Sequence, residues 1–237
     1  MTAARFIVPD WPAPAQVFAV STTCHSGDMG DAHGRANTNR TVLRRELELP
    51  GEPLWLRQVH GSVVVPHGDY EQPASADGSY TDTQGLVCAV LTADCVPVLL
   101  CNRQGTEVAA LHAGWRGLVA GVLQSGLAAM SSPADELLAW LGPGICAAHY
   151  EVGTEVRDAF VEILHQPADL ERGFRWRQAG KWSADLAALT ASILAHQGVQ
   201  QIYAYDGCTF GDTKQFYSYR RDKPTGRQAS LIWLRED

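Results

Sequence analysis

Short, almost unbroken apolar runs recur along the chain. Residues 86–91 (LVCAVL) and 108–111 (VAAL) contain no charged residue, which is typical of strands that are covered on both faces. The region 53–65 (PLWLRQVHGSVVV) is rich in β-branched and aromatic side chains and predicts two strands around a turn at Gly61. We expect further strands at three shorter apolar segments, residues 137–141, 201–205 and 229–234.

Three other segments repeat their apolar residues with the 3.6-residue period of a helix. The stripes are Val119, Leu123, Leu127 and Met130, then Val156, Phe160, Ile163 and Leu164, and finally Leu186, Leu189, Ile193 and Leu194. We expect Thr154 to cap the second helix, and the third helix to lie between Ser183 and Gly198. Hairpin-like strands alternate with helix-separated ones, so the order predicts an α+β fold with helices layered over mixed sheets rather than a doubly wound fold.

The composition is that of one ordinary globular domain. The chain has 237 residues, of which 46% are hydrophobic and 19% are charged, and these values exclude a disordered, collagen-like or coiled-coil protein. No internal repeat and no Ser/Gly-rich linker divides the sequence. We therefore predict a single domain over residues 1–237, and we take a monomer as the default state.

Charge and cysteine placement exclude several classes of protein. A net charge of −7 disfavours binding to nucleic acid through its phosphates, and no apolar run approaches the roughly 20 residues that span a bilayer. The N-terminal residues 1–16 lack the apolar core of a signal peptide, which predicts a cytoplasmic protein. The six cysteines form no Cys-x-x-Cys pair, and in a reducing cytoplasm we expect them to be free thiols.

Candidate chemistry is concentrated at predicted strand ends and turns. His60, Cys95 and His112 each stand beside small or turn-forming residues in the segments 58–61, 92–97 and 112–117. If the three meet, two imidazoles and one thiolate are a natural ligand set for Zn²⁺ and leave its fourth position open, as in catalytic zinc sites. Asp94 is a candidate to fix a ligating imidazole or to act as general base. From spacing alone, a cysteine placed like Cys95 is more often a small buried side chain than a ligand, and each histidine more often has a structural role.

Further sequence features favour the functional interpretation of these residues. The relevant stretches are Asn39-Arg40, WLRQVHGSVV (55–64), Ala76-Asp77-Gly78, LTADCVPVLL (91–100), HAGWRG (112–117), LGPGI (141–145), YEVG (150–153) and FYSYRRDKPTGRQASLIWL (216–234). Together they resemble the multicopper polyphenol oxidase/laccase-domain family, whose members are also described as purine nucleoside phosphorylases and peptidoglycan editing factors. TADC followed by HAGWRG is the most specific part of this resemblance.

The resemblance implies a fold, a metal and an activity. The fold would be an α/β/β/α arrangement similar to the catalytic domains of cytotoxic necrotising factors. His60, Cys95 and His112 would be the ligands of Zn²⁺. They would act in catalysis together with Asp94, whose candidate role rests on its position beside Cys95 and not on the resemblance. The implied reactions are phosphorolysis of adenosine, inosine, guanosine and methylthioadenosine, and deamination of adenosine.

Substrate contacts are expected from three further side chains. Arg40 and Arg116 are candidates to hold phosphate through paired donors, and Gln58 is a third candidate for substrate binding. One family stretch is divergent, because residues 22–27 (TTCHSG) lack much of the usual Thr-Thr-Arg and Gly-rich pattern. Substrate contacts made by that loop in the family are therefore not transferred to this chain.

Three alternatives use the same residues. Cys95, activated by His112, would serve as the nucleophile of an amide hydrolase that edits peptidoglycan precursors, or a bound metal would do this hydrolysis. Copper would support a polyphenol oxidase, but the chain has eight histidines and no His-x-His pair of the kind that feeds a trinuclear copper cluster. A metal-binding protein without catalysis is the third alternative, although structural zinc usually has four protein ligands.

Overall fold

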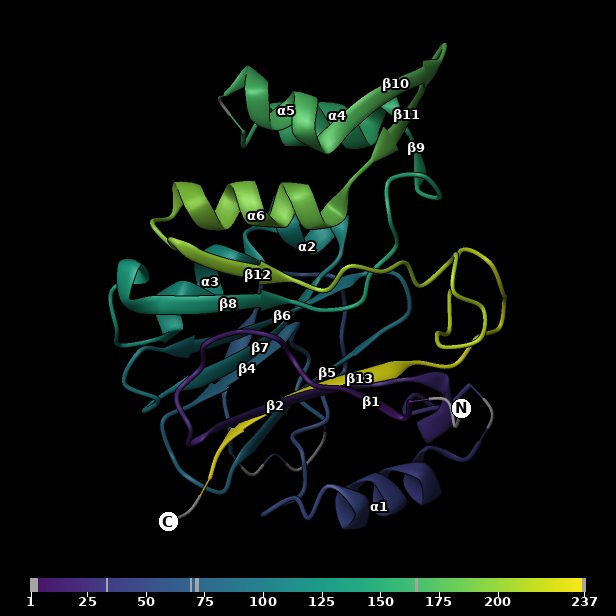
Figure 1. The fold of residues 1–237 in the computed structure, drawn as a ribbon. Helices are drawn as coiled ribbons and strands as arrows, with labels where there is room; N and C mark the ends of the chain where they lie inside the picture. The colour runs from purple at the N-terminus through teal and green to yellow at the C-terminus, as the bar shows by residue number, and fades with distance from the viewer. Residues whose placement is uncertain (1–3, 33, 69, 71–72, 165, 236–237) are drawn as a thin grey trace.

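A six-stranded sheet and a four-stranded sheet lie face to face at the centre of the protein (Figure 1). The computed structural model describes residues 4–32, 34–68, 70, 73–164 and 166–235. The larger sheet has the order β12 (Gln201–Ala204), β8 (Leu137–Leu141), β6 (Val96–Asn102), β7 (Val108–Ala113), β4 (Gly78–Thr81) and β3 (Val64–Pro66). The smaller has the order β1 (Phe6–Ile7), β2 (Val17–Thr22), β13 (Gln228–Leu234) and β5 (Val87–Thr92).

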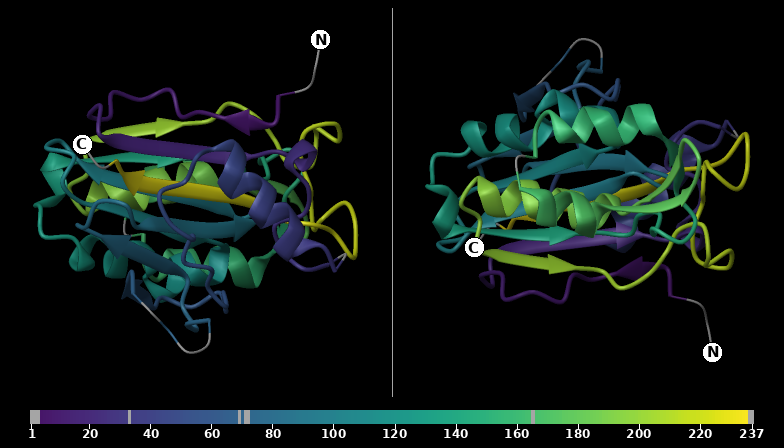
Figure 2. Two further views of the ribbon diagram at one scale, coloured as in Figure 1. Left: turned by 90° about the horizontal axis from the view of Figure 1, so that it is seen from below. Right: turned by 90° about the horizontal axis from the view of Figure 1, so that it is seen from above.

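Helices cover the outer faces of both sheets (Figure 2). The larger sheet is covered by α2 (Trp115–Ala120), α3 (Val122–Ala129) and α6 (Leu186–His196). Beyond these helices lie α4 (Thr154–Val161) and α5 (Pro167–Gly173). The same outer layer contains a small sheet of β10 (Phe174–Gln178), β11 (Lys181–Ala184) and β9 (Glu151–Gly153). The smaller sheet is covered by α1 (Ala36–Glu46). Short 3₁₀ helices lie at Cys24–Ser26 and Ala134–Glu136. The layers confirm the predicted α+β fold, in one compact unit.

Period-two alternation along the strands builds the core between these layers. In β6, Val98 and Leu100 pack toward the helices of the larger sheet, whereas Leu99 and Cys101 pack toward the smaller sheet. All of these side chains are fully buried. Both faces of the strand are thus covered, which is why β6 reads as a continuous apolar run.

The strands predicted at residues 86–91, 108–111, 137–141, 201–205 and 229–234 are confirmed, as is the third helix. The first two helices differ in detail: α4 ends at Val161, before Ile163 and Leu164 of its predicted stripe. The stripe that begins at Val119 belongs to two helices, because Gly121 takes a left-handed φ of 93° and ends α2 before α3 starts. The residue that caps α4 is Gly153, and Thr154 makes no capping hydrogen bond as the first helical residue.

The two strands predicted over residues 53–65 are largely absent. Leu54 forms one isolated bridge with Cys88, and only Val64 and Val65 of this region belong to a strand, β3. Between them the chain is irregular, with His60 at a φ of 59° and with backbone N–H groups that donate to a carboxylate rather than to a neighbouring strand. Within the described residues, no helix is both long and apolar enough to cross a bilayer.

Candidate active site

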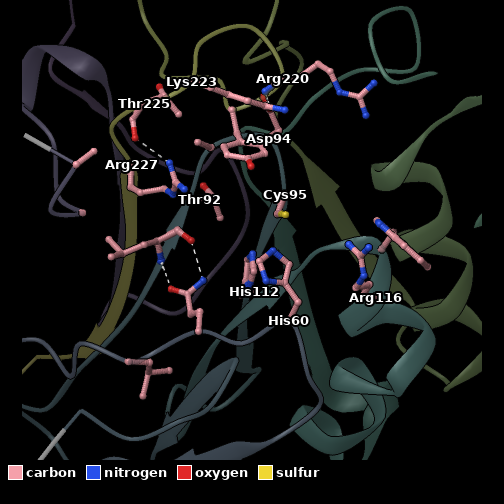
Figure 3. Close-up of a pocket in the computed structure, with 18 of the residues that line it drawn as sticks. His60, Thr92, Asp94, Cys95, His112, Arg116, Arg220, Lys223, Thr225 and Arg227 are labelled. Carbon is pink, nitrogen blue, oxygen red and sulfur yellow. Dashed lines mark hydrogen bonds between the residues drawn. The ribbon is translucent and has the colours of Figure 1, made fainter. Parts of the chain in front are cut away.

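His60, Cys95 and His112 converge at one end of the two central sheets. Their potential ligand atoms all lie within 4.8 Å of one another. The two imidazole rings meet edge to face, with centroids 4.8 Å apart and an interplanar angle of 75°. Figure 3 shows the sulfur and both rings turned toward one another inside a pocket. The arrangement predicted from the three motifs is therefore present as a compact group of soft donors.

Three different local structures place these side chains. His112 is the penultimate residue of β7 and pairs with Pro97 in β6. Cys95 lies in the tight turn between β5 and β6, where Asp94 has a φ of 101°. His60 lies in the irregular loop before β3 and is exposed, whereas His112 is buried. One ligand is thus fixed by a sheet, and the other two by loops at its edge.

A buried carboxylate, Asp77, joins the loop of His60 to His112 in β7. Its Oδ1 is 2.8 Å from Nδ1 of His112 and accepts the N–H of His60 at 2.9 Å. Its Oδ2 accepts the N–H groups of Gly61 at 2.7 Å and Val59 at 3.2 Å. Because Nδ1 of His112 is held by this carboxylate, Nε2 is the nitrogen left to face the cluster.

Gly114 provides the space in which the cluster forms. A Cβ at this position would stand 2.9 Å from Sγ of Cys95 and 3.2 Å from Cδ2 of His60. Both distances are shorter than an ordinary van der Waals contact. The glycine of the HAGWRG stretch is therefore required by close approach, since its φ of −85° is open to any residue.

Electrostatics favour a charged sulfur in this group. Burial raises the pKa of Cys95, but the charge of His112 and hydrogen bonds with His112 and His60 outweigh it and lower the pKa to about 6. Burial likewise opposes the imidazolium of His112, whereas the charges of Cys95 and Asp77 and hydrogen bonds to both raise its pKa. A thiolate is the form that binds metals and attacks carbonyl groups.

Asp94 is placed differently from the expectation. Its carboxylate is buried and accepts hydrogen bonds from Oγ1 of Thr209 at 2.7 Å and from the N–H of Arg220 at 2.6 Å. Its carbonyl oxygen accepts the N–H of Ile145 at 2.8 Å. The residue that fixes an imidazole is Asp77, and Asp94 instead ties the Cys95 turn to two other loops.

The pocket that contains the cluster has a volume of about 960 Å³, within the range of small-molecule sites. Its wall carries the aromatic side chains Trp115, Tyr150 and Tyr219. It also carries a group of cationic side chains, Arg116, Arg220, Lys223 and Arg227. Figure 3 shows Arg116 on one side of the ligands and Lys223 and Arg227 on the other.

Of the three residues expected to bind substrate, Arg116 and Gln58 line the pocket and Arg40 does not. Arg116 lines the pocket, and its guanidinium lies 4.4 Å from the ring centroid of Trp115. Gln58 also lines the pocket, but its amide exchanges two hydrogen bonds with the backbone of Leu91. Arg40 lies outside it, in a separate hollow of about 500 Å³, where it stacks 4.1 Å from the Trp55 centroid and donates to the carbonyl of Met29.

Several pocket residues had no role assigned from the sequence. They are the C-terminal group of Tyr219, Arg220, Lys223 and Arg227, and the same holds for Asp77, which does not line the pocket but holds His112. Both sets fall inside stretches that carry the family resemblance, residues 76–78 and 216–234. Only the family resemblance of those stretches could have identified these residues, because they lie far from the three ligands in the sequence.

The chain is similar over nearly its whole length to several known proteins. A Shigella flexneri protein named purine nucleoside phosphorylase YfiH is 45% identical over 97% of this chain and 99% of its own length. Purine nucleoside phosphorylase PA4543 of Pseudomonas aeruginosa is 43% identical over 98% of this chain and 99% of its own. The crystal structure of Neisseria meningitidis protein NMB0706 matches with a TM-score of 0.92 and 42% identity over 98% of this chain and 100% of that one.

A second solved structure, YlmD from Geobacillus stearothermophilus, covers 100% of this chain and 98% of that one with a TM-score of 0.90 at 26% identity. The family model of the multi-copper polyphenol oxidoreductase laccases matches residues 18–235. That match and the identities above extend over nearly the whole chain. The chain therefore belongs to the multi-copper polyphenol oxidoreductase laccase family.

Proposed function

We propose that this protein is a zinc-dependent purine nucleoside phosphorylase. The observation that carries the proposal is the joint presence, in one pocket, of the His60, Cys95 and His112 cluster and a set of cationic side chains. Relatives named purine nucleoside phosphorylase that are 45% and 43% identical support the same reaction class. The proposed substrates are purine nucleosides and phosphate.

The donor set fits a zinc ion. Two imidazoles and one thiolate are borderline-soft ligands, and three protein ligands are the number found in catalytic zinc sites. When bound, Zn²⁺ would supply Lewis acidity at the base of the pocket. The chain's own part is to keep His112 in one tautomer through Asp77 and to keep Cys95 deprotonated through the two imidazoles.

The remaining wall residues fit the two substrates. Arg116 and Lys223 are exposed at the pocket and would hold phosphate by charge-assisted hydrogen bonds. Tyr150 and Trp115 would pack on the purine, which has a flat apolar face. A phosphate oxygen would then attack the anomeric carbon, and the bond from that carbon to the purine would break. The purine nitrogen would leave with the electron pair and gain the proton that hydrogen phosphate gives up on becoming the ester.

Adenosine, inosine, guanosine and methylthioadenosine are the substrates we propose, with deamination of adenosine as a second reaction. Deamination needs a group that moves protons. Asp94 was the sequence-based candidate, but both of its oxygens already accept hydrogen bonds. We therefore assign Asp94 a positioning role at the Cys95 turn within this proposal.

The direct test is release of hypoxanthine from inosine in the presence of phosphate. We expect turnover by the purified protein, its loss after chelation, and its recovery when Zn²⁺ is returned. Cys95→Ala should lose both the bound metal and the turnover, whereas Cys24→Ser, in a half-buried cysteine outside the cluster, should keep both. Full phosphorolysis by a metal-free protein would contradict the zinc dependence.

A thiol hydrolase is the second candidate, and the lowered pKa of Cys95 favours it specifically. In that function the Cys95 thiolate would attack an amide carbon of a peptidoglycan precursor, the carbon–nitrogen bond would break, and the amine would leave with a proton from His112. Water would then hydrolyse the resulting thioester and restore the thiol. Rapid alkylation of Cys95 in the metal-free protein, together with amide cleavage that survives chelation, would favour this candidate over phosphorolysis.

Copper-dependent polyphenol oxidation and metal binding without catalysis remain further alternatives. The family's descriptive name supports copper, and the same soft ligands accept it. Restoring the chelated protein with Cu²⁺ rather than Zn²⁺ separates these cases, because a polyphenol oxidase would oxidise a phenol only in the copper form. A protein that binds metal and turns over none of these substrates would be the non-catalytic alternative.

A further inference from the structure

A second group of soft donors lies apart from the three proposed ligands. Cys146 and His149 belong to the loop that follows β8, and Cys208 belongs to the loop that follows β12. β8 and β12 are parallel neighbours, so their carboxyl ends reach the same edge of the sheet. The three potential ligand atoms lie within 4.8 Å of one another.

The spacing of these atoms is close to that of a metal site. Nδ1 of His149 is 3.2 Å from Sγ of Cys146 and 3.4 Å from Sγ of Cys208. In a tetrahedral zinc site with ordinary bond lengths, such ligand atoms stand about 3.5–3.8 Å apart. The two nitrogen–sulfur distances are therefore within a few tenths of an ångström of those in a zinc site.

The group is held in place by its surroundings. The ring of His149 stacks on Phe210 with centroids 4.6 Å apart and an angle of 22°. The two loops are joined by a bridge between Gly144 and Cys208 and by the hydrogen bond from Thr209 N to Gly144 O at 3.0 Å. The imidazole therefore points one nitrogen at both sulfurs before any ligand is bound.

One of the two sulfurs already accepts a hydrogen bond. The N–H of Cys146 donates to Sγ of Cys208 at 3.2 Å, and such donors stabilise a thiolate. Two adjacent thiolates repel each other, and a metal ion between them would remove that repulsion.

We propose that Cys146, His149 and Cys208 form a second metal site, selective for a thiolate-binding ion such as Zn²⁺. None of the three lines the pocket of His60, Cys95 and His112, so this ion would be separate from the proposed catalytic one. The three donors are half-buried or exposed, which gives an ion access from solvent.

The position of the site suggests what the ion does. The loop of Cys146 donates to the carbonyl of Asp94 through Ile145, and the loop of Cys208 donates to its carboxylate through Thr209. An ion that joins the two loops would fasten both sides of Asp94 and thereby the turn that carries Cys95. The second site is thus a positioning site, and its existence does not depend on the proposed reaction.

Cobalt binding to the reduced protein tests the proposal, because Co²⁺ replaces Zn²⁺ and shows a thiolate-to-cobalt absorption band. The experiment starts from Cys95→Ala, so that Cys146, His149 and Cys208 are the only group of three potential metal ligands left intact among the described residues. We expect this variant to keep the band and to bind about one zinc ion per chain after dialysis. Adding Cys146→Ser and Cys208→Ser should remove both signals, and adding His149→Ala should weaken the affinity.

The control replaces Cys24, which is half-buried and whose thiol donates to Lys214 O. Adding Cys24→Ser to Cys95→Ala should leave band and zinc content unchanged. Absence of the band in folded Cys95→Ala, or its persistence without Cys146 and Cys208, would overturn the proposal. The proposal would also be overturned if Cys146 and Cys208 form a disulfide, seen as the loss of two free thiols, and the reduced protein binds no cobalt.

Discussion

Asp77 organises more of the ligand cluster than any other single residue. Its carboxylate accepts one hydrogen bond from the His112 side and three from the backbone of the His60 loop. The hydrogen bond from His112, together with bonds from Gly61 and His60, keeps the pKa of Asp77 below its usual value against the effect of burial. One buried charge thus orients a sheet ligand and a loop ligand together.

We expect Asp77→Asn to lower zinc affinity by roughly 10–100-fold, the usual effect of removing a partner of a ligating histidine. The amide of asparagine would turn a donor toward N–H groups that need an acceptor. Competition with a chelator of known affinity measures the change. The matched control is Asp82→Asn, an exposed aspartate just after β4, and equal affinity in both variants would contradict the role of Asp77.

Gly114→Ala tests the close approach of the ligands. The added methyl group would stand 2.9 Å from the Cys95 sulfur, so the cluster would have to open by several tenths of an ångström. We expect metal content and phosphorolysis to fall by about 10-fold or more while the fold is kept, because a shift of about 1 Å at a reacting group has effects of this size. Gly68→Ala is the control, since among the described residues, its chain neighbours aside, the nearest atom to its Cβ would be a ring carbon of Tyr70 at 3.9 Å.

Residue-scale chemistry was only partly predictable from the sequence. The three ligands stand beside turn residues at strand ends, and that local pattern is visible in the chain. Asp77 precedes His112 by 35 positions and meets it only because β4 pairs with β7. That contact cannot be predicted from the spacing of residues along the sequence. The same holds for the contact between Arg220 and Asp94, which are 126 positions apart.

At the scale of elements, α5 and α6 are joined by a buried carboxylate. Asp169 accepts hydrogen bonds from Ser192 at 3.0 Å and from His196 at 2.6 Å. The hydrogen bond from His196 lowers the pKa of Asp169 and outweighs the effect of burial. A carboxyl group with a lowered folded-state pKa stabilises the fold only while it is ionised.

The stability that Asp169 provides should therefore depend on pH in a defined direction. It is fully present above the unfolded-state pKa of about 3.9 and is lost as the pH falls through the lower folded-state value. We expect Asp169→Asn to reduce the free energy of unfolding at neutral pH by about 1–2 kcal/mol, and the difference from wild type to shrink in acid. Urea unfolding at several pH values measures both effects. Asp158→Asn, at an exposed position in α4, should change little.

Elements were predictable where burial on both faces leaves a continuous apolar run. β5, β7 and β8 follow that pattern, as does the buried strand β13. Residues 55–63 are rich in β-branched and aromatic side chains but form a loop, since Gln58 and the N–H groups near His60 bond to partners distant in sequence. The composition of a segment shows how apolar it is. Whether the segment joins a sheet depends on its contacts with residues distant in the sequence.

At the scale of the whole molecule, positive side chains gather at the pocket although the net charge of the protein is negative. The chain carries −7 overall, yet the pocket gathers Arg116, Arg220, Lys223 and Arg227 around the ligand cluster. Arg220 and Arg227 donate to backbone carbonyls, whereas Arg116 and Lys223 rest on aromatic rings. The last two are therefore the cations best placed to bind a small anion inside an otherwise acidic protein.

Within the proposed phosphorolysis, Arg116→Ala and Lys223→Ala should each raise KM for phosphate by roughly 10-fold, since a hydrogen bond to a charged group contributes about 1.5–3 kcal/mol, reduced here by exposure to solvent. KM for inosine should change much less, because the purine contacts are aromatic. Raising the ionic strength should increase KM for phosphate in the wild type and have a smaller effect in the double variant, as screening acts on the charges that remain. Arg175→Ala, on the exposed face of β10, should leave both constants unchanged. A phosphate KM that is indifferent to Arg116, Lys223 and salt would place the anion elsewhere and remove the electrostatic part of the proposal.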